Sequence, residues 1–346
     1  MTEHPFSLRP RGLRPWLLWL AGLFILVAAC AAPATSTTPP AASMASPAAS
    51  TASPATSTAP AVSARLQVLA TTTILGDVVK NVAGEAADVR TLLPVNADPH
   101  GFQPTPADVV LISQADLVFV NGLGLEELLL PLLAGALPAH KIVAVSEGIE
   151  PIVAHAAEDA HEEAAEHDHA EGIDPHTWTD PTHVILWTQV IAAALAAADP
   201  AQAERYQANA RAYEQTLRDL DAWVQEQVAQ VPPAQRLLVS EHAVFAYFAR
   251  RYGFTQVGTV IPGFSALAEP SAQDLAALED AIRQVGVRAI FVGNTVNPRL
   301  AERVAADTGI RVIPVYSGSL SAADGPASTY VAYIRYNTHA FVAGMN

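Results

Sequence analysis

The 346-residue sequence is poor in cysteine and in charged side chains. A single cysteine, Cys30, excludes an intramolecular disulfide and a multi-cysteine zinc site, so soft-metal chemistry would depend on the eleven histidines. Only 15% of the residues are charged, and 19 basic against 34 acidic side chains leave a formal net charge of -15. Because such a chain repels phosphates, we expect no nucleic acid partner.

Common catalytic motifs are also missing from the sequence. Neither lysine, Lys80 nor Lys141, follows a glycine, which excludes a Walker-type phosphate-binding loop. The pair His161-Glu162 begins like a zinc-protease helix, but Ala165 holds the place of the second histidine. No serine lies in a Gly-x-Ser-x-Gly elbow. The sequence therefore matches none of these enzyme templates.

The first thirty residues have the layout of a signal peptide, with three arginines before an apolar run that is shorter than the roughly 20 residues of a membrane span. The run ends in Val27-Ala28-Ala29-Cys30, which resembles a bacterial lipobox. We expect residues 1–29 to be removed and Cys30 to be lipidated. Residues 30–64 are almost entirely Ala, Pro, Ser and Thr, which predicts an extended tether. The mature protein is then extracytoplasmic and lipid-anchored, on the periplasmic or cell-surface side.

From Arg65 onward, short β-rich runs alternate with helical patterns, which predicts an α/β fold of two lobes with parallel sheets. In the N-terminal lobe, residues 65–180, we expect strands near 66–70, 89–93, 117–120 and 142–145, and helices near 75–83, 106–114 and 126–133. In the C-terminal lobe, residues 232–346, we expect strands near 237–240, 256–261, 289–292 and 312–315, and helices near 244–252, 272–285, 299–308 and 328–343. Residues 181–231 read as a long helical connector, interrupted only at Asp199-Pro200.

A repeated tripeptide is the main candidate for chemistry. Asp98-Pro99-His100 follows the second expected strand, and Asp174-Pro175-His176 precedes the connector. Proline fixes φ, so each histidine is presented from a stiffened loop, as a preorganised ligand requires. His242 follows the strand ending at Ser240, and ligands bind at the carboxyl ends of strands in open α/β sheets. We therefore expect His100, His176 and His242 to bind a metal ion.

A second group of histidines lies among seven acidic residues in the segment 155–171. No helical or strand period organises this segment, so we expect a mobile loop. Imidazole together with carboxylate suits transition metals, although a solvated acidic loop is the alternative. The pattern favours auxiliary metal capture by four residues: His155, His161, His167 and His169.

These histidines and their surroundings resemble a known family, the metal-binding lipoproteins that serve as solute-binding components of zinc and manganese ABC importers (cluster A-I). The resemblance runs from about Leu66 to the C-terminus. Its matching stretches are residues 98–100 with 103–106, 174–181, 241–248 with 251–253, and 330–337. It implies two lobes bridged by one long helix, with the metal at the lobe interface and an ABC permease as partner. It also implies that His100 and His176 are ligands from the N-terminal lobe and His242 the first from the C-terminal lobe.

One position departs from the family pattern. The family's fourth ligand is commonly an aspartate, and Gly318 stands at the matching position. The fourth coordination position is then open, held by water, or reached by Glu241 or Asp324. Because imidazoles suit zinc whereas manganese favours carboxylate oxygens, we expect Zn²⁺ as the cargo, with Mn²⁺ less favoured.

The sequence thus predicts a monomeric, membrane-tethered protein that captures zinc for an ABC permease and is not an enzyme. Two alternatives stay open at this point. Three histidines with an open fourth position are also the layout of a zinc hydrolase, for which Glu241 is the candidate general base. The other alternative is a surface adhesion module with a structural metal, which should melt when the metal is removed.

Replacing Cys30 by Ser should release the protein from membranes, because the expected lipid is attached to this sulfur. Fractionation followed by immunoblotting measures the distribution between membrane and soluble fractions. A Ser36→Ala variant in the same tether should stay with the membrane fraction. Membrane association that survives Cys30→Ser would contradict the predicted anchor.

Overall fold

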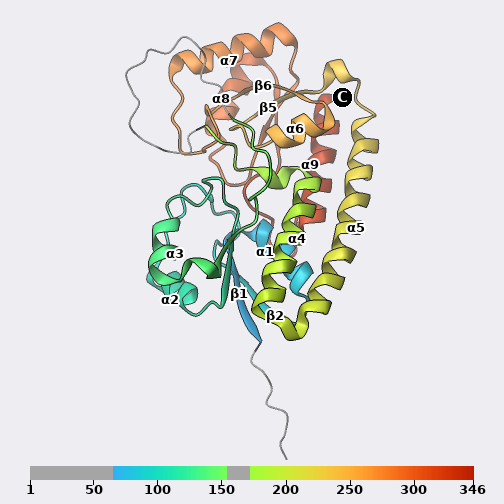
Figure 1. The fold of residues 1–346 in the computed structure, drawn as a ribbon. Coiled ribbons are helices and arrows are strands. Elements are labelled where there is room, and N and C mark those ends of the chain that lie inside the picture. The colour runs from blue at the N-terminus through green and yellow to red at the C-terminus, as the bar shows by residue number, and fades with distance from the viewer. Residues whose placement is uncertain (1–64, 154–171) are drawn as a thin grey trace, which may run out of the picture. The chain divides into compact units, whose positions relative to one another are not determined.

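A computed structural model describes residues 65–153 and 172–346 of the chain. The predictions for the signal peptide, the tether with Cys30 and the four loop histidines lie outside these residues. In the described part, the chain forms two four-stranded sheets, one in each half of the sequence, and all paired strands in both are parallel (Figure 1).

The N-terminal lobe is built on a sheet with the strand order β2-β1-β3-β4. Its strands are β1 (Leu66–Ala70), β2 (Ala87–Thr91), β3 (Leu117–Val120) and β4 (Ile142–Ala144). Its helices are α1 (Thr73–Ala83), α2 (Pro106–Ser113) and α3 (Leu130–Ala136). Alternate residues of β3 enter different hydrophobic clusters, Phe119 on one face and Val118 on the other. The sheet is therefore covered on both faces, as parallel sheets require.

The C-terminal lobe repeats this arrangement with the strand order β6-β5-β7-β8. Its strands are β5 (Leu237–Ser240), β6 (Thr255–Thr259), β7 (Ala289–Val292) and β8 (Arg311–Pro314). Its helices are α6 (Ala246–Tyr252), α7 (Ala272–Val285), α8 (Arg299–Thr308) and α9 (Tyr330–Met345). The equivalent strand orders confirm the predicted α/β fold with two parallel-sheet lobes.

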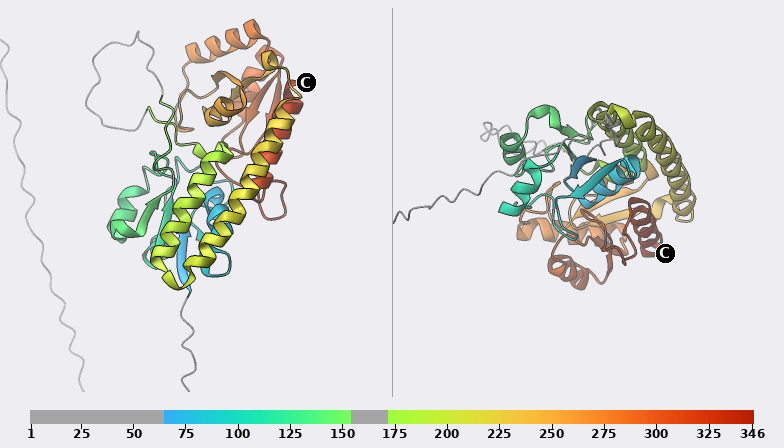
Figure 2. Two further views of the ribbon diagram at one scale, coloured as in Figure 1. Left: turned by 45° about the vertical axis from the view of Figure 1, so that its right-hand side comes forward. Right: turned by 90° about the horizontal axis from the view of Figure 1, so that it is seen from below.

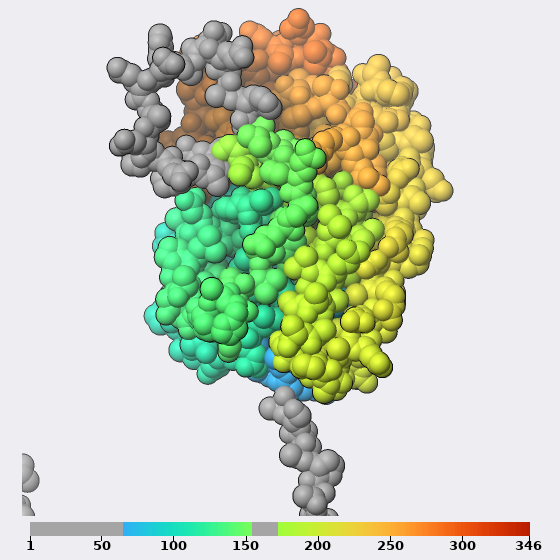
Figure 3. All heavy atoms as spheres, in the orientation of Figure 1, coloured from blue at the N-terminus to red at the C-terminus, as the bar shows by residue number. Residues whose placement is uncertain are grey.

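The stretch predicted as a connector holds two helices, α4 (Pro181–Ala198) and α5 (Ala203–Val228), which lie side by side (Figures 1 and 2). They part at the expected interruption, Asp199-Pro200. α5 packs against α1 of the first lobe and α9 of the second, so α5 bridges the lobes. In Figure 3, α4 and α5 cover one side of the N-terminal lobe. By length and composition alone α4 could cross a membrane, but 39% of it is buried, and it packs on α1 and α5.

The helix expected to begin at Glu126 begins only at Leu130. The Glu126 carboxylate accepts hydrogen bonds from the backbone N–H of Asn121 at 2.7 Å and of Gly122 at 3.2 Å. Leu123 adopts a φ of 55°, so the chain is still turning at this point. Glutamate is a good helix former, but here its side chain closes the turn that precedes the helix.

A charged network joins α5 to α6 and to the start of α4. Asp221 on α5 accepts hydrogen bonds from Nε and Nη2 of Arg251, both at 2.6 Å, and from the Tyr252 hydroxyl at 2.8 Å. Arg251 Nε also lies 3.4 Å from Oδ1 of Asp180, the N-cap of α4. Because Asp180 follows His176 by four residues, the network fixes the segment that carries this histidine.

Replacing Asp221 by Asn should lower the free energy of unfolding by about 1–2 kcal/mol, because the buried Asp221 side chain loses its charge-assisted hydrogen bonds to the partly exposed Arg251. Urea denaturation measures the change. A matched Asp307→Asn variant disrupts the exposed Arg303–Asp307 pair and should leave the midpoint unchanged. Equal midpoints for both variants would show that the network does not stabilise the fold.

Candidate metal centre

The three histidines predicted as ligands come together between the two lobes. His100 lies in the loop after β2, His176 precedes the short 3₁₀ helix η2 (Thr177–Thr179), and His242 follows β5. His176 Nε2 lies 3.1 Å from His100 Nε2 and 3.3 Å from His242 Nε2. Tetrahedral zinc with Zn–N bonds of 2.0–2.1 Å separates its nitrogens by ~3.3 Å. His176 Nε2 is therefore spaced from each of the other two so that they could share one ion, and the ligand atoms of all three histidines lie within 4.8 Å of one another.

Access to the cluster is unequal. His176 and His242 are 1% and 2% exposed, whereas His100 is only partly buried. His100 is therefore the most accessible of the three histidines in the described part of the chain.

In both Asp-Pro-His tripeptides the aspartate side chain accepts a hydrogen bond from the backbone N–H of the histidine. Asp98 Oδ1 accepts a hydrogen bond from the His100 backbone N–H at 3.0 Å, and Asp174 Oδ1 accepts one from His176 N–H at 2.9 Å. Asp174 Oδ1 also lies 2.7 Å from His176 Nδ1. These bonds hold the His100 and His176 backbones in place and orient the ring of His176, which lowers the entropy lost when a metal binds.

Burial determines the protonation of the cluster. Desolvation lowers the pKa of His176 and His242 well below the ordinary value and also lowers the pKa of His100, whose charged form Asp98 favours. Burial raises the pKa of Asp174 to about 8, and that of Glu241 to about 7. The apo cluster therefore favours neutral imidazoles, whose lone pairs are available to a metal ion.

Hydrogen bonds between the lobes surround the cluster. Trp178 Nε1 donates to the Ser317 carbonyl at 3.1 Å, and the backbone N–H of Asn96 donates to Ser319 Oγ at 2.9 Å. Asn294 Nδ2 donates to Asn96 Oδ1 at 2.7 Å. Sequence reasoning missed these residues, because side-chain amides and hydroxyls carry no pattern that reveals a partner in the other lobe.

Gly318 lies against the loop that carries His100. A Cβ on Gly318 would be 2.9 Å from Pro99 Cδ and 3.3 Å from Thr295 Oγ1. The absence of a side chain lets the segment pack closely on Pro99. Among the described residues, the group of ligand atoms within 4.8 Å of one another comes from the three histidines alone. Asp324 is exposed, and the Glu241 carboxylate lies on the Nδ1 side of His242.

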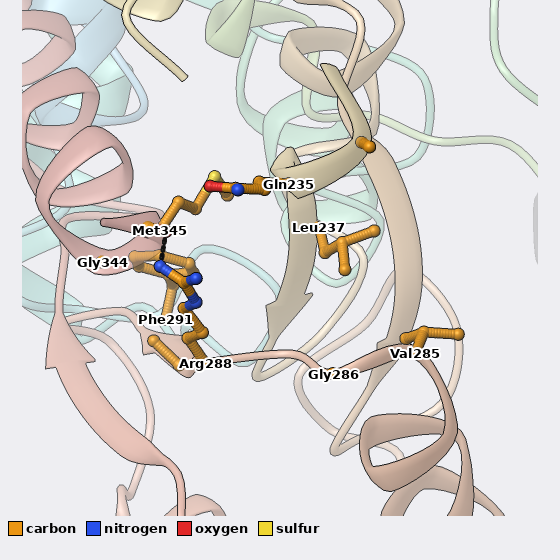
Figure 4. A pocket seen from close by; sticks show the side chains of 10 residues that line it. Gln235, Leu237, Val285, Gly286, Arg288, Phe291, Gly344 and Met345 are labelled. Carbon is orange, nitrogen blue, oxygen red and sulfur yellow. Dashed lines mark hydrogen bonds between the residues drawn. The ribbon is translucent and has the colours of Figure 1, made fainter. Parts of the chain in front are cut away.

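A small pocket in the C-terminal lobe is separate from the cluster (Figure 4). It has a volume of about 110 Å³, and its lining includes Leu237, Arg288 and Met345. Arg288 Nη1 donates a hydrogen bond to the Met345 carbonyl at 2.7 Å. Leu237 and Arg288 lie at the amino ends of β5 and β7, whereas His242 follows the carboxyl end of β5. The pocket therefore lies at the amino ends of the strands, away from the carboxyl ends where His242 is found.

Comparison with known families identifies the arrangement. The model of the ZnuA family, described as the periplasmic component A of a zinc-uptake complex, matches residues 68–344. The chain belongs to the ZnuA family. Members of this family are metal-binding substrate-binding proteins of ABC importers, partners of a permease and not enzymes. This membership excludes the hydrolase alternative, and Glu241 does not lie with the Nε2 atoms where a general base would be needed.

Relatives of this ZnuA-family chain carry different metals in their names. The manganese-binding lipoprotein MntA of Halalkalibacterium halodurans is 33% identical over 282 residues, which cover 81% of this chain and 89% of that protein. The iron-binding protein YfeA of Yersinia pestis is 31% identical, covering 81% and 86%. The solved structure of the periplasmic zinc-binding protein TroA from Treponema pallidum has a TM-score of 0.73 and 27% identity, covering 81% and 99%. The Mn-bound periplasmic metal-binding protein of Candidatus Liberibacter asiaticus has a TM-score of 0.71 and 29% identity, covering 82% and 100%.

Deleting residues 155–170 should remove weak zinc sites and leave one tight site. Histidines with an ordinary pKa of about 6.5 become charged as the pH falls to about 6 and then lose zinc. The cluster should retain zinc at that pH, because burial holds the pKa of its histidines lower. Calorimetric titration with zinc at about pH 7.5 and about pH 6 measures both classes of site. Loss of the tight site together with the segment would contradict this separation.

Proposed function

We propose that this protein captures Zn²⁺ outside the cytoplasm and delivers it to the permease, with His100, His176 and His242 as ligands. The observation that carries the choice of zinc is the ligand group in the described part of the chain, which consists of imidazoles without a carboxylate oxygen. Manganese favours carboxylate oxygens and a larger number of ligands, whereas three imidazoles suit zinc. Because the relatives are named for manganese, iron and zinc, ligand chemistry supports the proposal more directly than their names do.

A water molecule would complete a tetrahedron around zinc in this proposal. The same three nitrogens and one water would leave manganese with too few ligands, and the Irving–Williams order also places zinc above manganese. The lobes provide a route for release, since moving them apart separates His242 from His100 and His176. The interlobe hydrogen bonds from Trp178 and Asn96 would have to break in that motion.

Segments outside the described residues would support metal delivery. A lipid on Cys30 would hold the mature monomer at the membrane, and residues 30–64 would let the lobes reach the permease. The histidines of the segment 155–171 would raise the local concentration of zinc near the cluster. A large hydrophobic core continues through both lobes. This core supports a carrier that stays folded without its cargo rather than a metal-stabilised adhesion module.

The unmodified protein should prefer zinc over manganese by orders of magnitude, because its ligand group lacks carboxylates. Competition titrations with both metals at fixed pH measure the two affinities. Replacing any one of the three histidines by alanine should weaken zinc binding strongly. Equal affinities would contradict the proposal, as would zinc binding that survives His100→Ala and His242→Ala together in a protein lacking residues 155–170.

The same titration tests the position of Gly318. Gly318→Asp places a carboxylate beside the Asp98-Pro99-His100 loop, so the ratio of zinc affinity to manganese affinity should fall. Gly318→Asn is the matched control, because it makes the same close contact with Pro99 without adding a charge. The ratio should stay near that of the unmodified protein in the Asn variant, even where both affinities drop.

A further inference from the structure

The Glu241 carboxylate is buried beside a metal-site histidine. Its residue is 2% exposed, and the carboxylate lies against the Gly293 backbone and the Ser317 hydroxyl. Oε1 lies 3.6 Å from Nδ1 of His242, which has no hydrogen-bond partner in the described part of the chain. Leaving a buried ring nitrogen unpaired is costly, so its place next to a carboxylate calls for an explanation.

The orientation of the His242 ring places Nε2 toward the cluster and Nδ1 toward the carboxylate. Nε2 of His242 points to the cluster, 3.3 Å from His176 Nε2. An imidazole that gives its Nε2 lone pair to a metal carries its proton on Nδ1. Metal-binding histidines almost always donate this second N–H to a carboxylate, a carbonyl or water. When a metal binds, the donor on His242 would therefore point at Glu241.

His176, the other buried histidine of the cluster, already has a carboxylate at hydrogen-bonding distance behind its ring. Asp174 Oδ1 lies 2.7 Å from His176 Nδ1, and Asp174 is fully buried. Each lobe thus supplies one histidine with a buried carboxylate behind its ring. Since position 318 contributes no side chain, these two carboxylates lie where an ionised group would oppose a divalent cation through the rings.

The surroundings of Glu241 hold its carboxylate in this place. A Cβ on Gly293 would overlap both Glu241 Oε1 and Ser317 Oγ, so a glycine at position 293 makes room for them. The Glu241 carbonyl accepts a hydrogen bond from Ile261 N–H at 2.6 Å, which fixes the backbone beside β6. The carboxylate therefore has little freedom to swing toward the Nε2 side of His242.

We propose that Glu241 is a positioning residue that accepts the Nδ1–H of His242 when the metal binds and opposes the charge of the ion without contacting it. This inference rests on the proposed function. It assigns Glu241 to the hydrogen bond behind the ring instead of the fourth coordination position. The contact closes from 3.6 Å to a normal charge-assisted length of about 2.8 Å.

Two substitutions in the full mature chain separate charge from hydrogen bonding. Glu241→Gln keeps an acceptor oxygen and loses the charge, and Glu241→Met loses both at similar volume. Zinc affinity, measured against a chelating competitor, should fall about 10-fold in the Gln variant and up to about 100-fold in the Met variant. The control is Glu279→Gln, which alters a glutamate on α7 that pairs with Arg283 and should leave zinc affinity unchanged.

Two spectroscopic readouts distinguish positioning from direct ligation and from a purely structural role. The absorption bands of the Co²⁺-loaded protein report the number and geometry of ligands, which should be the same with and without Glu241. Nitrogen NMR of the zinc-loaded, unmodified protein should show His242 protonated at Nδ1, with that proton hydrogen-bonded and protected from exchange. The proton should lose its protection in the Met variant.

Several results would overturn the inference. A folded Met variant with unchanged zinc affinity would do so, as would a Co²⁺ spectrum that shows a lost ligand in the Gln variant. If neither variant folds, NMR of the unmodified protein still decides, because a proton on Nε2 of zinc-loaded His242 is incompatible with the proposal. Failure of the unmodified protein to bind zinc tightly is a separate outcome, which would overturn the proposed function itself.

Discussion

Under the proposed function, three neutral imidazole nitrogens have to meet at one ion, although their residues are far apart in the sequence. His176 is 76 residues from His100 and 66 from His242, and the last of these belongs to a different lobe. Two parallel sheets and the helix α5, which packs on α1 of one lobe and α9 of the other, meet this requirement. The hydrogen bonds of Trp178 and Asn96 across the interface depend on the same arrangement.

Burial accounts for much of the chemistry of the cluster. It disfavours the charged form of each histidine and so leaves the nitrogens available to a metal. It also raises the pKa of Asp174, so the apo cluster holds little buried charge. A divalent ion reverses this balance, since its charge favours ionised carboxylates behind the rings. Under the proposed function, the metal-free cluster therefore holds little buried charge, and the charge of the bound ion is opposed by the carboxylates.

The parts of this structure that follow from local patterns were predictable from the sequence. Strand and helix periods located both sheets, and Asp199-Pro200 marked the break between α4 and α5. The repeated Asp-Pro-His tripeptide singled out two histidines because proline stiffens the loops that present them. The orientation of Glu241 and the contacts of Gly318 were not predictable. They depend on side-chain directions and on the packing of one lobe against the other, which no local period reports.

X-ray absorption spectroscopy of the zinc-loaded protein without residues 155–170 tests the central claim most directly, because it counts the atoms around the ion. The account predicts three imidazole nitrogens at about 2.0–2.1 Å and one further light atom from water. A shell of five or six ligands rich in carboxylate oxygen, or one with fewer than three imidazoles, would contradict it.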